Sequence, residues 1–127
     1  MKNNVTLTVT SLLSIILLSF HLAGDIVLGY EQGGLSNLVA IPILVVWLYA
    51  TLMLTGRRSG YIILLLFSLL GSLVPWFHMR GSGLGGAVAK HGADVFFVWG
   101  TLAMGVTSLF SVILSVQGLW SLGRRAQ

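Results

Sequence analysis

The sequence predicts an all-α integral membrane protein, a bundle of four transmembrane helices. Of its 127 residues, 56% are hydrophobic and only 8% are charged, whereas a soluble domain usually carries about 25% charged residues. Each of four charge-free stretches is long enough for a transmembrane helix, because about 20 apolar residues cross the hydrocarbon core. These stretches are residues 3–24, 32–56, 59–79 and 95–123.

Little of the chain lies outside these stretches, so residues 1–127 are predicted to form a single transmembrane domain. The expected spans are residues 5–30, 36–56, 60–79 and 92–122. The first span, with Lys2 before it and small residues near Gly24, also resembles a signal peptide. Its apolar run exceeds the usual ~7–15 residues of such a signal, so we expect a retained helix.

The first span opens with VTLTVTS, whose alternation of apolar and polar residues is typical of a strand. A single strand would leave its backbone polar groups without partners in lipid, so a helix is expected instead. On a helix Thr6, Thr10 and Ser14 share one face, and their hydroxyls can bond to preceding carbonyls.

The next two spans carry recognisable boundary signals. Ser36 or Asn37 suits an N-cap for the second span, which tolerates Pro42 near its start. That span is expected to end in a tight turn at residues 56–60, GRRSG. In the third span, Pro75 predicts a kink or an opened helix end.

A stripe of small residues marks the fourth span, where Ala103, Thr107, Ser111 and Ser115 recur at every fourth position. Small residues let membrane helices approach closely. We prefer packing inside the bundle to the alternative, a dimer face.

Aromatic residues lie near the ends of the spans, as they do in the interfacial belts of membrane proteins. Tyr30, Trp76 and Phe77 fit an outer belt, and Tyr61 and Trp120 fit an inner one.

The positive charges predict the orientation of the bundle. Four spans place both termini on one side, together with Lys2, Arg57, Arg58, Arg124 and Arg125, whereas only Arg80 and Lys90 lie on the other. The positive-inside rule then gives a multi-pass protein of the inner (plasma) membrane with cytoplasmic termini. Nucleic acid is excluded as a partner, because no basic stripe carries interleaved stacking aromatics.

Every acidic residue and every histidine is expected in the outer half of the bundle, the six being His21, Asp25, Glu31, His78, His91 and Asp94. His21 and Asp25 are four residues apart and share a helix face. If the helix ends converge, imidazoles and carboxylates could bind a divalent metal at His21, Asp25, His78, His91 and Asp94, or relay protons. Haem between His21 and His78 is the less favoured option.

A structural interpretation of the same residues is favoured over a site. Asp94 would complement the dipole of the helix that it begins. Glu31, Arg80 and Lys90 are candidates for ion pairs on the outer side. No cofactor is therefore predicted.

Motifs for catalysis are not found. The chain contains no cysteine, which excludes disulfides, thiolate catalysis and Fe–S clusters. Gly81, Gly83 and Gly86 match G-x-G-x-x-G, but they join two membrane helices rather than a strand and a helix.

Several segments, HLAGDIVLGYEQGGLSNL, VVWLYATL, RRSGYIILLL, HMRG and GLWSL, resemble a group of small four-span bacterial integral membrane proteins with no established function. The resemblance covers most of the chain. It implies a bacterial four-span protein and implies no site residue.

We therefore expect a non-enzymatic role, as an accessory subunit of a membrane complex or as a small homo-oligomer. The expected partners are the lipid bilayer and either other membrane subunits or further copies of the chain. The alternatives are a small proton or cation transporter or channel that uses His21 and Asp25, and a metal- or haem-dependent redox subunit.

Overall fold

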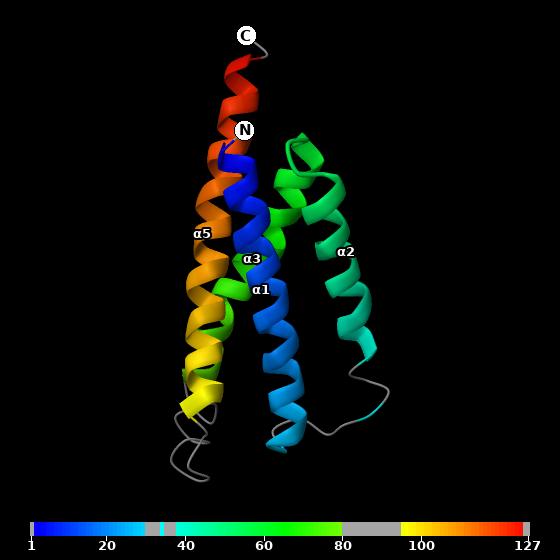
Figure 1. Cartoon of the computed structure of the whole chain (residues 1–127), viewed down its shortest axis with the longest axis vertical. Coiled ribbons are helices and arrows are strands. Elements are labelled where there is room, and N and C mark those ends of the chain that lie inside the picture. The colour runs from blue at the N-terminus through cyan, green and yellow to red at the C-terminus, as the bar shows by residue number, and fades with distance from the viewer. Residues whose placement is uncertain (1, 30–33, 35–37, 80–94, 126–127) are drawn as a thin grey trace.

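Four helices account for nearly all of the described chain. The computed structural model describes residues 2–29, 34, 38–79 and 95–125. Its helices are α1 (Lys2–Val27), α2 (Ala40–Met53), α3 (Arg58–Met79) and α5 (Val95–Arg125), as Figure 1 shows. The predicted all-α four-helix bundle is confirmed, and α1, α3 and α5 are long and apolar enough to cross a membrane.

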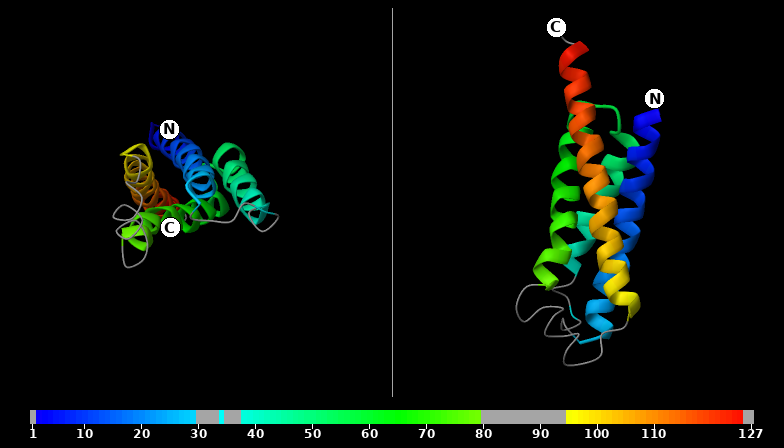
Figure 2. Two further views of the ribbon diagram at one scale, coloured as in Figure 1. Left: turned by 90° about the horizontal axis from the view of Figure 1, so that it is seen from below. Right: turned by 90° about the vertical axis from the view of Figure 1, so that its left-hand side faces the viewer.

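Successive helices run in opposite directions, so both termini lie at the same end of the bundle (Figure 1). We call this the terminal end, and we call the opposite end, where α1 finishes and α5 begins, the loop end. Helices α1 and α3 lie at the centre, with α5 and α2 on opposite sides (Figure 2, left). Helix α5 packs mainly on α3 and α1, whereas α2 makes a smaller contact with the same two helices.

Helix α2 is shorter than the span expected at residues 36–56. Its 14 residues extend only about 21 Å at the helical rise of about 1.5 Å per residue, less than the ~30 Å hydrocarbon core. It ends at Met53 because the chain then turns, with the Arg57 amide donating to the Leu54 carbonyl at 2.9 Å and Gly56 at φ +92°. The predicted caps Ser36 and Asn37 lie outside the described residues.

The first span is a helix from its beginning, as predicted. Its hydroxyls bond backwards, Thr10 to the Leu7 carbonyl at 3.1 Å and Ser14 to the Thr10 carbonyl at 2.9 Å. The hydroxyls thus find acceptors within their own helix, and the continuous helix Lys2–Val27 satisfies its own backbone polar groups, as lipid requires of a spanning segment.

The interior combines a small apolar core with buried hydroxyls. Trp47 of α2 stacks on Phe67 of α3, with ring centroids 5.6 Å apart, and its indole N–H donates to Ser11 of α1 at 2.9 Å. The Ser11 hydroxyl also lies 2.8 Å from that of Thr51. This three-residue contact is the main link between α2 and α1.

Small residues bring α3 and α5 close together. A Cβ on Gly71 of α3 would lie 2.6 Å from the Ser108 hydroxyl, and a Cβ on Gly105 would lie 2.6 Å from the Pro75 ring. Ser111 and Ser115 are fully buried. Ser111 and Ser115 of the small-residue stripe thus pack within the bundle, as the preferred interpretation predicts. Helix α3 continues through Pro75 to Met79.

Tyr61, predicted for an inner interfacial belt, points into the bundle. Its side chain is only 5% exposed, and its hydroxyl donates to Asn4 at 2.6 Å. The ring lies directly against Gly118, where a Cβ would overlap it. Gly118 on α5 leaves the space that the Tyr61 ring occupies. Trp120, by contrast, is exposed on the surface.

We expect Gly71→Leu to destabilise the bundle by about 1–3 kcal/mol, because an added side chain must displace Ser108 or the Trp47 ring. Gly123→Leu is the matched control, since a Cβ there meets nothing within 4 Å. Unfolding in mixed micelles of increasing dodecyl sulfate, followed by circular dichroism, measures both. Equal stability of the two variants would contradict the close α3/α5 contact.

Candidate functional site between α1 and α5

The His21–Asp25 pair predicted from the sequence lies inside the bundle near the loop end. The Nε2 atom of His21 is 3.4 Å from Oδ2 of Asp25, and both side chains are at most 10% exposed. The two residues continue the inward face of α1, which also carries Leu7, Ser11 and Ser14. The pair is thus enclosed by protein near the loop end of the bundle.

Helix α5 supplies the rest of this cluster. The Oγ1 atom of Thr101 lies 3.2 Å from Nδ1 of His21, and the Phe97 ring stacks on the imidazole with centroids 5.1 Å apart. Gly24 permits this approach, because a Cβ at that position would lie 2.9 Å from the Phe97 ring. We call His21, Asp25 and Thr101 the polar triad.

The triad allows two hydrogen-bond arrangements, which differ in the direction of the Thr101 hydroxyl proton. The Thr101 hydroxyl is 2.8 Å from the Phe97 carbonyl and 3.2 Å from the His21 ring, yet it has only one proton to donate. If that proton points to the carbonyl, the Thr101 oxygen is free to accept a hydrogen bond from Nδ1 of His21. If it points to Nδ1, the imidazole is neutral and keeps its proton on Nε2.

The Thr101 hydroxyl can therefore donate to the imidazole or accept from it by rotating, without any movement of the helices. Buried imidazole and carboxylate groups of this kind mark proton or ligand sites in membrane proteins more often than they mark packing.

A second polar layer lies closer to the terminal end. The hydroxyl oxygens of Ser14 and Thr107 lie 3.1 Å apart, and Ser111 donates to Thr10 at 2.9 Å. Between this layer and the triad, the fully buried Met104 lies on α5. In the part of the chain that the structure describes, the two polar layers are thus separated by an apolar one.

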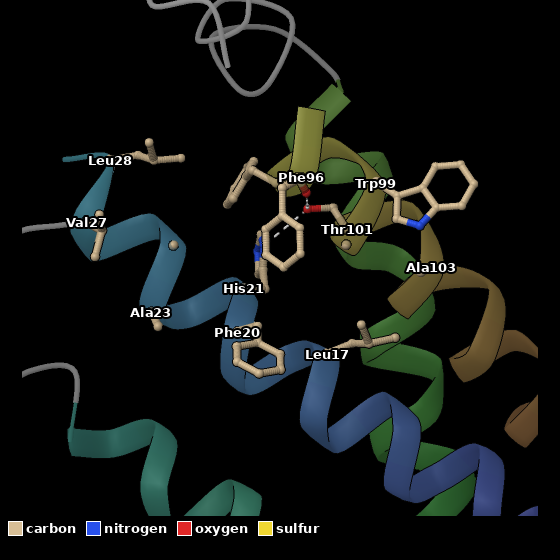
Figure 3. A pocket seen from close by; sticks show the side chains of 13 residues that line it. Leu17, Phe20, His21, Ala23, Val27, Leu28, Phe96, Trp99, Thr101 and Ala103 are labelled. Carbon is tan, nitrogen blue, oxygen red and sulfur yellow. Dashed lines mark hydrogen bonds between the residues drawn. The ribbon is translucent and has the colours of Figure 1, made fainter. Parts of the chain in front are cut away.

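A groove of about 350 Å³ opens beside the triad, between α1 and α5. Figure 3 shows His21 and Thr101 at its centre, joined by their hydrogen bond, with Phe20 on the α1 side and Trp99 on the α5 side. Both aromatic side chains are more than half exposed. The groove thus faces outward from the bundle, in the direction of lipid.

The other predicted site residues are not brought together by the described chain. His78 lies in the last turn of α3, but its side chain is outside the described part. Glu31, Arg80, Lys90, His91 and Asp94 also lie outside the described residues. The predicted outer ion pairs and the cap at the start of the fourth span stay predictions.

A metal site is not formed by the described residues, among which no three His, Asp or Glu side chains gather. The His21–Asp25 pair supplies one nitrogen and one carboxylate, fewer than a transition metal requires. A site completed by the remaining histidines stays a prediction.

Thr101, Phe97 and Gly24 are the site residues that sequence reasoning missed. The i, i+4 spacing of a pair within one helix is visible in a sequence. The partner on α5 depends on the register between two helices, and it lies 80 positions from His21 in the chain. A periodic signal did exist, because Thr101, Ser108, Ser111 and Ser115 are the buried polar positions of α5.

Searches against protein-family models, curated proteins and solved structures found no match to this chain.

Proposed function

We propose that this protein is a non-enzymatic, multi-pass component of the bacterial inner (plasma) membrane, which works as an accessory subunit of a membrane complex or as a homo-oligomer. The observation that carries the proposal is the incomplete packing of α2. Only Trp47, Ala50 and Thr51 of this helix are buried. Its other faces are apolar and open.

The length of α2 supports the same proposal. A span shorter than the hydrocarbon core is accommodated by thinning the bilayer, by snorkelling of flanking residues or by oligomerisation. The exposed side chains Val45, Val46, Tyr49 and Leu52 of α2 carry no charge, and the flanking cations Arg57 and Arg58 can snorkel only at its terminal end. A partner helix against this face would shield a helix that is too short for the bilayer.

The distribution of cations supports the proposed orientation. Arg57, Arg58 and Arg124 are exposed and lie at the terminal end of the bundle. The Arg124 guanidinium lies 4.3 Å from the Trp120 ring, a pairing that suits a membrane interface. Both termini are accordingly proposed to lie in the cytoplasm.

We expect the protein to leave the membrane as a complex of fixed stoichiometry when it is extracted in native lipid discs and analysed by native mass spectrometry. Val45→Trp, on the exposed face of α2, should break that complex, whereas Val106→Trp, on the exposed face of α5, should leave it intact. The mass of the intact complex distinguishes other subunits from copies of the chain. A wild-type protein that is monomeric in such discs would contradict the proposal.

Proton or cation movement is a second candidate function, favoured by the 3.4 Å His21–Asp25 pair in the bundle interior. The buried layer at Met104 opposes it, because a polar path would have to open there. In proteoliposomes with a pH gradient, this candidate requires a proton flux that Asp25→Asn abolishes. Equal flux through wild type, Asp25→Asn and protein-free vesicles would eliminate it.

A further inference from the structure

We infer that the groove between α1 and α5 binds a membrane-dissolved, uncharged ligand with a flat ring and a ring carbonyl, a ligand of the quinone class. The inference goes beyond the proposed role in a complex, because a single chain forms the whole groove. At about 350 Å³ the groove falls within the ~300–1,000 Å³ range of small-molecule sites.

The walls of the groove suit a flat ring. Phe20, Phe96 and Trp99 supply aromatic surfaces, and Gly100 leaves the space between them open. A Cβ on Gly100 would meet nothing within 4 Å. An aromatic or quinonoid ring gains offset stacking with such walls, which a saturated acyl chain does not.

The floor of the groove supplies a hydrogen bond. Thr101 is only 1% exposed and His21 only 6% exposed, and both line the groove. The Thr101 hydroxyl can turn from the Phe97 carbonyl toward a ligand, because that carbonyl also accepts the helical N–H of residue 101. A ring carbonyl would accept this bond.

The charges around the groove favour an uncharged ligand. None of the groove residues that the structure describes is a lysine or an arginine, and the imidazole of His21 already faces Asp25, so a phosphate or carboxylate headgroup would find no available cationic side chain there. Asp25 lies behind His21 and would repel an anion. A lipid headgroup is therefore a poorer occupant than a neutral carbonyl.

The route of entry follows from the exposed rim. Phe96, Trp99 and Val27 are 69%, 72% and 83% exposed, and they surround an opening on the side of the bundle. A ligand dissolved in the bilayer would thus reach the triad laterally, without passing through water.

The test uses the purified full chain in lipid nanodiscs made from synthetic phosphatidylcholine, with decyl-benzoquinone as the probe. Quinones quench indole fluorescence at short range, so the signal of Trp99 should fall as the mole fraction of probe in the bilayer rises. Trp99→Phe gives the background from the other tryptophans. Saturable quenching of the wild type above that background is the expected result.

Two variants locate the site. Gly100→Leu fills the groove and should weaken binding at least about tenfold, whereas Gly123→Leu, also on α5 and also pointing to open space, should not change it. Thr101→Val keeps the shape and removes the hydroxyl, and it should weaken binding about three- to tenfold, as the loss of one hydrogen bond does.

A second probe distinguishes a site that binds a ring carbonyl from a groove that accepts any apolar chain. Decylbenzene has the same chain and no carbonyl, and it should not compete with the quinone. Equal competition by decylbenzene, together with an unchanged affinity in Thr101→Val, would overturn the inference. Unsaturable quenching, or an affinity that Gly100→Leu leaves unchanged, would also overturn it.

Discussion

His21→Leu is expected to lower the free energy of unfolding by about 3–5 kcal/mol, the usual result of removing one partner of a buried charged pair. The imidazole faces the Asp25 carboxyl group at 3.4 Å, in a cluster at most 10% exposed. Without it, the carboxylate must lose its charge or open the interface between α1 and α5. Unfolding in dodecyl sulfate mixed micelles measures the change.

The double variant His21→Leu/Asp25→Leu tests the physical reason for that loss. It removes both polar groups together and is expected to be more stable than His21→Leu alone, because no charge is left in the interior. Phe20→Leu, beside the pair but 60% exposed, serves as the control and should be near neutral. Additive losses in the double variant would contradict a coupled pair.

Trp47→Ala is expected to have the second largest effect, with a loss of about 2–4 kcal/mol, toward the lower end of buried-aromatic truncations. The side chain is 1% exposed, stacks on Phe67 and bonds to Ser11. The change leaves a cavity and removes the donor that joins α2 to α1. Lipid limits the loss, since the separated helices still lie in an apolar medium.

Trp120→Ala is the matched control for that variant. Trp120 is 63% exposed, and its contact with Arg124 is worth only about 0.5–1 kcal/mol at an exposed site. The same micelle titration should therefore separate the two tryptophans clearly. A small effect of Trp47→Ala would mean that α2 is held by something other than this contact.

Much of the fold follows from charge and hydropathy alone, because a segment that crosses lipid must hydrogen-bond its own backbone polar groups and therefore forms a helix. The charge-free stretches at residues 3–24, 59–79 and 95–123 correspond closely to α1, α3 and α5. Helix α2 was predicted too long, because an apolar run does not show where the chain leaves the helix. The turn at Gly56, with its positive φ, sets that end.

The candidate site was only half predictable for a different reason. His21 and Asp25 share a face by helix periodicity, which one sequence displays. Their burial and their contact with Thr101 depend on how α1 packs against α5. Gly24 permits this packing because it leaves space for the Phe97 ring. The inward packing of Tyr61 was not predictable for the same reason, since the space that receives its ring comes from Gly118 on another helix.

The hydroxyl contacts between helices help to hold this bundle together in a membrane. Lipid offers no hydrophobic drive for helix association, so small residues and hydrogen bonds between helices hold the bundle together. Ser11, Thr51 and Trp47 join α1 to α2, and Ser14 with Thr107 joins α1 to α5. The polar triad extends that second contact toward the loop end.

The most direct test of the account is disulfide cross-linking of α1 to α5 in native membranes, because the register of these helices creates the triad. The chain contains no cysteine, so paired substitutions are free of background. Ser14→Cys with Thr107→Cys replaces side chains whose oxygens are 3.1 Å apart, and it should form an intramolecular disulfide rapidly. Val9→Cys with Val106→Cys, on exposed faces, should not. Cross-linking of the second pair and not of the first would contradict the register and, with it, the site.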